Sequence, residues 1–189
     1  MPSAPARKPG KLRIVGGSLR GSRLDVIDRD ELRPSSDRLR ETLFNWLAPM
    51  IEGARCLDLY AGTGALGIEA ISRGARECVF VERDRTLAKQ LESTLARLNV
   101  SAGRVICADA LHWLAQPAGK FDLVFLDPPF PAALWAESAR RLEAGGWLDE
   151  SAWIHVEAPA DAVLELPPNW SVHRESRAGA VHFAVYRRS

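Results

Sequence analysis

From residue 55 onward the sequence alternates short apolar runs with helical stretches, and this alternation restricts the fold more than any other feature. The expected strands are residues 55–61, 78–83, 104–109, 121–127 and 152–158. The expected helices are residues 64–72, 85–98, 110–114 and 132–142. Apolar runs without strict polar alternation are typical of strands buried on both faces. The pattern therefore predicts an α/β fold, a doubly wound parallel sheet with helices on both sides.

The N-terminal part of the chain departs from this alternation. Residues 11–27 contain two short strand-like runs joined by a Gly-rich connection, which predicts a β-hairpin. Residues 33–50 have apolar side chains at helical spacing and predict a helix. Ser35 or Ser36 is expected to cap this helix, and Pro49 is expected to mark its end.

The C-terminal part also departs from it, because residues 170–188 predict two strands around an Ala-Gly-Ala turn. Such a pair forms an antiparallel hairpin, which would complete the parallel sheet. The length suits one such domain with an extension. The expected divisions are a flexible basic tail at 1–10, a hairpin-and-helix extension at 11–52, and a main domain at 53–189.

The composition indicates the cellular compartment that we expect for this protein. Hydrophobic residues make up 47% and charged residues 26%, which is ordinary for a globular protein. The sequence has no membrane-length apolar run and its start lacks the apolar core of a signal peptide, so we expect a cytoplasmic protein without membrane contact. Cys56, Cys78 and Cys107 are widely spaced and each falls in an expected strand. This predicts buried free thiols and no metal site.

The net charge of +1 hides an uneven distribution. Before the first acid, Asp25, the chain carries only bases: Arg7, Lys8, Lys11, Arg13, Arg20 and Arg23. A basic arm on a mildly acidic body indicates a polyanionic partner. A solvated tail is the alternative; it is preferred for residues 1–10, and both interpretations stay open for residues 11–23.

Glycines and acids follow the expected strands. In an open parallel sheet, ligands bind beyond the carboxyl ends of the strands. Gly62, Gly64 and Gly67 form a GxGxxG pattern after the first strand, where the backbone can approach a ligand closely. Glu82 ends the second strand, twenty residues after Gly62, and is suited to bind ribose hydroxyls. Asp109 ends the third strand and suits either an adenine contact or a cap on the next helix.

Asp58 separates two classes of nucleotide ligand. The glycine pattern alone is also found in dehydrogenases. Asp58 lies just before the glycine turn, where it would repel a pyrophosphate but attract an ammonium or sulfonium group. This favours S-adenosylmethionine, which carries both cations and no phosphate; a plain turn or cap role for Asp58 is the alternative.

The fourth strand ends in an unusual corner, Asp127-Pro128-Pro129-Phe130. Proline cannot continue a strand ladder, so the two prolines fix a rigid turn beyond the sheet. Oxygens held in such a turn could accept hydrogen bonds from an exocyclic base amine, and Phe130 could stack on the base. Asp127 could also take the proton that the amine loses. The alternative is a strand-ending turn with a core aromatic residue.

Five segments together resemble the bacterial small-subunit rRNA guanine-N2 methyltransferases: RIVGGSLRG, RPSSDRLRETLFNWL, LDLYAGTGALGIEAISRGA, VFVERD and FDLVFLDPPF. The resemblance covers about residues 13–130. It implies a class I methyltransferase fold with seven strands, the last hairpin antiparallel. It also implies transfer of a methyl group from S-adenosylmethionine, with S-adenosylhomocysteine as product, to the 2-amine of a guanine in 16S rRNA of assembled or partly assembled small ribosomal subunits.

The resemblance also assigns roles to residues. The catalytic set is Asp127, Pro128, Pro129 and Phe130. The cofactor set is Asp58, Tyr60 (where Phe is expected), Gly62, Thr63, Gly64, Glu82, Arg83, Asp109 and Ala110. The RNA-binding set is Lys11, Arg13, Arg20, Arg23, Arg33, Arg38 and Arg40. Arg38 or Arg40 could instead pair with Asp37 or Glu41 on a solvated helix face. We expect a monomer.

Four other functions compete with this interpretation. A DNA adenine-N6 methyltransferase is the nearest rival, but the chain has little length for a separate DNA-recognition domain. A protein-glutamine methyltransferase usually has Asn where Asp127 stands. A dehydrogenase leaves Asp58 and the proline corner unexplained, and a non-catalytic RNA-binding module has no need of a cofactor pocket.

Overall fold

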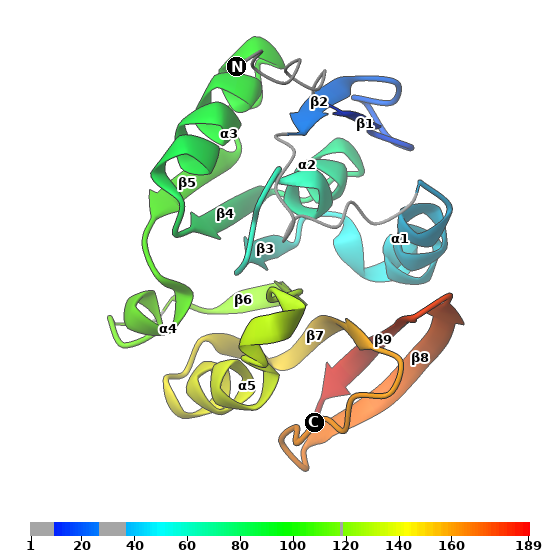
Figure 1. The fold of residues 1–189 in the computed structure, drawn as a ribbon, viewed down its shortest axis with the longest axis vertical. Coiled ribbons are helices and arrows are strands. Elements are labelled where there is room, and N and C mark those ends of the chain that lie inside the picture. The colour runs from blue at the N-terminus through cyan, green and yellow to red at the C-terminus, as the bar shows by residue number, and fades with distance from the viewer. Residues whose placement is uncertain (1–9, 27–36, 118) are drawn as a thin grey trace, which may run out of the picture.

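The computed structural model describes residues 10–26, 37–117 and 119–189. Its main element is a seven-stranded sheet in the order β5-β4-β3-β6-β7-β9-β8 (Figure 1). The strands are β3 (Arg55–Asp58), β4 (Glu77–Glu82), β5 (Gly103–Cys107), β6 (Phe121–Leu126), β7 (Leu148–Pro159), β8 (Trp170–Ala178) and β9 (Val181–Arg188). The first five run parallel, and β9 pairs antiparallel with both β7 and β8. The predicted doubly wound sheet with an antiparallel C-terminal hairpin is confirmed.

Helices cover both faces of this sheet (Figure 1). One face carries α1 (Asp37–Ile51), α2 (Ala65–Ser72), α3 (Arg85–Arg97) and the predicted hairpin, β1 (Gly10–Arg13) with β2 (Arg23–Val26). The other carries α4 (Ala110–Trp113) and α5 (Trp135–Ala144). Successive strand residues serve opposite faces, as Cys56 packs in the first core cluster and Leu57 in the second. Both faces are therefore apolar, which explains the lack of polar alternation.

The hairpin is docked on α2 by backbone contacts. The buried carboxylate of Glu69 accepts hydrogen bonds from the amides of Val15 at 2.9 Å and Gly16 at 2.8 Å. Gly17 has a φ of +74°, and a Cβ there would lie 1.8 Å from the carbonyl oxygen of Ser72. Only glycine fits so close an approach. The hairpin thus has a defined place against the sheet's first helix.

Two predicted helix boundaries are wrong. α1 continues through Pro49 to Ile51, because a proline in the last turn removes a single helical hydrogen bond. The helix expected from residue 132 begins at Trp135 instead. A 3-10 turn, η1 (Phe130–Ala132), and Ala133 at a φ of +48° precede it and fix the corner after β6.

The prediction of three buried thiols holds for Cys56 and Cys78 and is wrong for Cys107, which is exposed. Cys107 lies on β5, the edge strand of the sheet, where one side of the strand has no neighbour. The expected caps Ser35 and Ser36, and most of the expected tail, lie outside the described residues. Among the helices that the structure does describe, none is long and apolar enough to cross a membrane.

Candidate functional site

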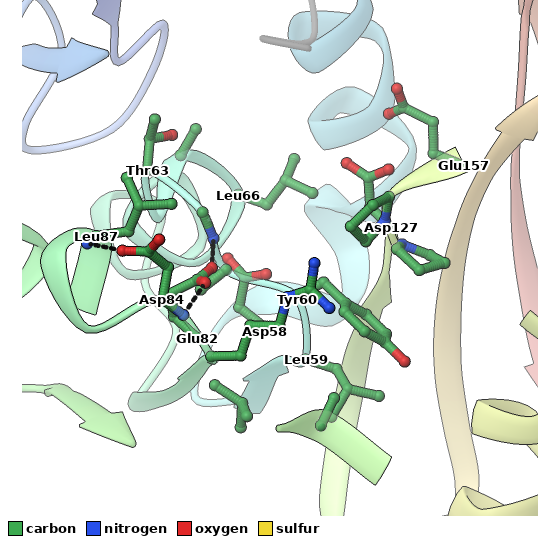
Figure 2. Close-up of a pocket in the computed structure, with 18 of the residues that line it drawn as sticks. Asp58, Leu59, Tyr60, Thr63, Leu66, Glu82, Asp84, Leu87, Asp127 and Glu157 are labelled. Carbon is green, nitrogen blue, oxygen red and sulfur yellow. Dashed lines mark hydrogen bonds between the residues drawn. The ribbon is translucent and has the colours of Figure 1, made fainter. Parts of the chain in front are cut away.

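A cavity of about 410 Å³ opens beyond the carboxyl ends of β3, β4, β6 and β7. This volume lies in the range of sites for small organic ligands and cofactors. The cavity brings together Asp58, Glu82 and Asp127 (Figure 2), and Asp109 also lines it. These are the acids at the ends of four expected strands. The facing wall includes residues of the hairpin and α1. The structure therefore groups the strand-end acids in one place, under a cover made by the N-terminal extension.

The glycine loop is braced by Glu82. One carboxylate oxygen of Glu82 accepts the amide of Gly62 at 2.8 Å, and the other accepts the amide of Asp84 at 2.7 Å (Figure 2). Gly64, at a φ of +77°, is the N-cap of α2 and lies in a region that residues with a side chain avoid. Glu82 thus holds the loop in place, and each of its oxygens keeps a further lone pair for a ligand hydroxyl.

Asp58 is a buried acid, 2% exposed, at the end of β3. Its carboxylate accepts the amide of Gly67 at 3.0 Å. Burial raises the pKa of Asp58 to about 7; the Gly67 hydrogen bond lowers it in part, and the charge of Glu82 raises it further. Its described neighbours are thus an amide donor and a second acid. A cationic ligand would complete the charge balance of this corner.

The corner after β6 lies at the other end of the cavity. Pro128 is buried, and Asp127, Pro129 and Phe130 are partly exposed along the cavity lining. The ring of Phe130 packs against that of Trp135 with centroids 5.9 Å apart and planes tilted by 50°. The corner is thus backed by α5, and one ring lies at the cavity edge, where a flat ligand could stack.

Glu157, from the end of β7, is a site residue that the sequence analysis missed. Its side chain is 3% exposed and lines the cavity on the same side as Asp127 (Figure 2). The pKa of Asp127 is raised well above its ordinary value by withdrawal from water, then by the charges of Glu157 and Asp58. Two facing carboxyls do not both ionise readily, so they favour sharing one proton.

The histidine beside Glu157 does not neutralise it. The Nε2 of His155 lies 3.9 Å from Glu157 Oε2, beyond hydrogen-bond distance. Burial lowers the pKa of His155 to about 4, so its imidazole is neutral at pH 7. The sequence did carry a signal for Glu157, since it is the acid near the end of the fifth expected strand. Glu157 therefore stands in the same kind of position as the acids at the ends of the other four strands.

The other predicted cofactor residues also border the cavity, except Gly64, which is not among its lining residues. Asp109 caps α4 by accepting the amide of His112 at 2.9 Å, which confirms the cap role. It also lines the cavity, so capping does not exclude an adenine contact. The hydroxyl of Tyr60 shares a 2.6 Å hydrogen bond with Ser138 Oγ and ties the glycine loop to α5. The remaining lining residues from the predicted set are Thr63, Arg83 and Ala110.

The predicted RNA-binding residues fall into two groups. Lys11, Arg13, Arg20, Arg23 and Arg38 are exposed on the hairpin and α1, and Arg33 lies outside the described residues. Arg40 is fully buried and borders the cavity. Its Nη2 donates to Asp37 Oδ1 and to the Arg13 carbonyl oxygen, each at 2.6 Å. Arg40 therefore does pair with Asp37, but on a buried face and not on a solvated one.

Within residues 10–26, 37–117 and 119–189, no group of three or more His, Cys, Asp or Glu side chains is arranged to hold a metal ion.

The sheet order, the glycine loop and the acids at the ends of β3 and β4 define a class I methyltransferase. The family model described as "Conserved hypothetical protein 95" matches residues 12–187, and the chain belongs to this family. Comparison with curated proteins and with solved structures gives relatives over nearly the whole chain.

The chain is 47% identical over 180 residues to "Ribosomal RNA small subunit methyltransferase D" of Escherichia coli (strain K12), covering 95% of this chain and 91% of the relative. It is 42% identical over 182 residues to the protein of the same name from Haemophilus influenzae, covering 94% of each. A solved structure of Escherichia coli yhhF matches with a TM-score of 0.89 and 45% identity, covering 95% of this chain and 99% of that one.

Proposed function

We propose that this chain transfers a methyl group from S-adenosylmethionine to the 2-amine of a guanine in 16S rRNA, leaving S-adenosylhomocysteine. The observation that carries the proposal is that the corner from Asp127 to Phe130 opens into the same cavity as Asp58 and Glu82. The names of the relatives support small-subunit rRNA as the substrate class. We take the substrate to be assembled or partly assembled small subunits in the cytoplasm and the enzyme to act as a monomer.

The residues present fit this cofactor. Asp58 would hold the ammonium group, because a buried carboxylate whose described neighbours include no cation gains most from a positive ligand. Glu82 would accept the ribose hydroxyls, and the glycine loop allows close backbone approach. Asp109 would accept a hydrogen bond from the adenine amine. When bound, the cofactor supplies an electrophilic methyl group on a positively charged sulfur.

Asp127 would act on the target amine. The lone pair of a guanine 2-amine is delocalised into the ring, so the nitrogen attacks well only when acceptors hold its protons. Asp127 and the rigid carbonyls of the two prolines offer such acceptors. The raised pKa of Asp127 makes its ionised form a better proton acceptor than an ordinary carboxylate, and Glu157 can share the proton that the amine loses.

Substrate binding would use the outer face of the extension. The exposed bases of the hairpin and α1 lie outside the wall that covers the cavity, where they can contact RNA phosphates. Such contacts orient the RNA without choosing the base. Phe130 would stack on the guanine once it leaves its own stack.

The test is transfer of labelled methyl to unmethylated small subunits, naked 16S rRNA and duplex DNA, followed by mass identification of the modified nucleoside. We expect N2-methylguanosine, formed mainly with the subunits, and its loss in Asp127→Ala. Asp161→Ala, in an exposed turn after β7, is the matched control and should retain activity. N6-methyladenine in DNA, or the absence of any transfer to RNA, would overturn the substrate assignment while leaving the fold intact.

A further inference from the structure

The guanidinium of Arg40 is buried with part of its hydrogen-bonding capacity unused. Its side chain is 0% exposed, and it borders the cavity from α1. Nη2 is occupied by Asp37 and the Arg13 carbonyl. Nε and Nη1 have no hydrogen-bond acceptor among the residues that the structure describes. The half of this cation that lies away from Asp37 is therefore left for another partner.

Leaving such donors unpaired is unfavourable. A buried donor without an acceptor costs about 1–3 kcal/mol, and more when the group is charged. Burial lowers the pKa of Arg40, and the charges of Asp37 and Glu69 oppose that effect, so the guanidinium remains charged. A cation kept in this state beside a ligand cavity is suited to an anion that arrives with the ligand.

An RNA phosphate is a poor candidate for this anion. Arg40 has no exposed surface, whereas Lys11, Arg13, Arg20 and Arg23 are exposed on the hairpin. A phosphate on the RNA backbone would meet these outer side chains first. The partner of Arg40 must instead enter the cavity.

The target base is the competing partner, because a guanine also carries hydrogen-bond acceptors. Arg40 lies near Glu69 of α2, and its helix also packs over β6 through Phe44 and Phe125, so position along the cavity does not separate the two ligands. The difference lies in charge: the base is neutral, whereas S-adenosylmethionine carries one carboxylate, and a buried guanidinium pairs best with an anion.

We propose that Arg40 binds the carboxylate of the methionine moiety of S-adenosylmethionine, an inference that rests on the proposed function. The cofactor's amine and carboxylate share one carbon, so an amine held at Asp58 brings the carboxylate into the same end of the cavity. Asp58 and Arg40 then form a matched pair, an acid for the ammonium and a base for the carboxylate. The extension would therefore contribute to cofactor binding as well as to RNA binding.

The test compares binding of S-adenosylmethionine and its decarboxylated form, which keeps the ammonium and lacks the carboxylate. Calorimetry is done with the full chain and with Arg40→Met, Arg40→Lys and Arg174→Met. We expect the unaltered chain to prefer the carboxylated ligand roughly 10- to 100-fold. Arg40→Met should bring this preference close to one, and Arg40→Lys should give an intermediate value because a point charge replaces the planar group. Arg174→Met, at an exposed position on β8 that does not line the cavity, should keep the full preference.

Several outcomes would overturn the inference. One is equal loss of affinity for both ligands in Arg40→Met, which would indicate a purely structural residue. Another is unchanged cofactor binding with reduced methyl transfer, which would indicate a substrate contact. If Arg40→Met does not fold, an unchanged preference in Arg40→Lys overturns the inference and a reduced one supports it. Failure of the unaltered chain to bind either ligand would instead overturn the proposed cofactor.

Discussion

The two walls of the cavity differ in charge and in origin. The sheet wall carries acids from strand ends, among them Asp58, Glu82, Asp127 and Glu157. The covering wall, from the hairpin and α1, contributes apolar side chains and the buried base Arg40. The sheet wall is set by where parallel strands end, whereas the covering wall depends on docking of an extension. The difference suggests that cation binding and proton transfer belong to the sheet wall, and that the cover adds anion binding and substrate contact.

The sheet wall should dominate catalysis, and Asp127→Asn tests this most strongly. The amide keeps the shape of the side chain but can neither carry charge nor take a proton from the amine. We expect methyl transfer to small subunits to fall by about 10³-fold, in the range of general acid–base catalysis. Cofactor affinity should change little, as calorimetry can check. A turnover within tenfold of the unaltered chain would contradict the role given to Asp127.

Asp58→Asn should act on the cofactor and not on the chemical step. Loss of a buried carboxylate that faces an ammonium should weaken S-adenosylmethionine binding roughly 100-fold. The measurement is calorimetric affinity beside the rate at saturating cofactor, which should fall much less. A large fall in rate with unchanged affinity would move Asp58 from cofactor binding to catalysis.

The pH dependence of binding should follow Asp58. With a pKa of about 7 in the free protein, Asp58 is protonated below that pH and ionised above it. Because the ionised form attracts the ammonium, affinity should fall as pH drops below about 7, by up to about tenfold per unit, with proton release on binding. Calorimetry in two buffers of different ionisation enthalpy measures this release. Asp58→Asn should bind with little pH dependence, and a flat profile in the unaltered chain would count against the assignment.

The sheet wall could be predicted in large part because its residues follow strands directly. Asp58, Glu82 and Asp127 stand beside apolar runs in the sequence, and parallel strands bring such positions to one edge. Glu157 lies two residues before the end of β7 at Pro159, a position similar to those of the other strand-end acids. The local pattern showed an acid there without showing which way it faces.

The covering wall could not be predicted because its key contacts join distant segments. The burial of Arg40 depends on the Arg13 carbonyl, 27 residues earlier in the chain. The docking of the hairpin depends on Glu69, more than fifty residues later than Val15. At helical spacing Arg40 lies in line with Leu43 and Leu47, which are buried in α1, but nothing local indicated that the hairpin would cover it.

Gly17→Ala should disturb the covering wall and leave the sheet wall unchanged. Gly21→Ala serves as its matched control. Both glycines have positive φ, +74° and +87°, so each alanine meets a similar backbone strain of about 1–2 kcal/mol. At Gly17 the new Cβ would also collide with the Ser72 carbonyl at 1.8 Å, whereas nothing lies within 4 Å at Gly21. We expect Gly17→Ala to lose about 1–3 kcal/mol more stability in urea unfolding.

The same pair of variants tests whether the cover contributes to function. Gly17→Ala should weaken both cofactor binding and RNA methylation, because the hairpin and the Arg13 carbonyl shift together. Gly21→Ala should lower stability while leaving both activities near those of the unaltered chain. Equal losses of stability and activity in the two variants would show that docking against α2 does not matter.

The smallest expected effect concerns the outer face of the cover. Arg20 is exposed in the connection between β1 and β2 of the hairpin. Arg174 is exposed on β8, which is the edge strand of the sheet at the opposite end from β5. Each ion pair with a phosphate contributes about one to the slope of log affinity against log salt concentration. Arg20→Gln should therefore make the salt dependence of RNA binding less steep, and it should lower the affinity for RNA about threefold. Arg174→Gln, with the same change of net charge, should leave both unchanged. If the two variants behaved alike, RNA attraction would arise from overall charge, and the hairpin would have no special part in it.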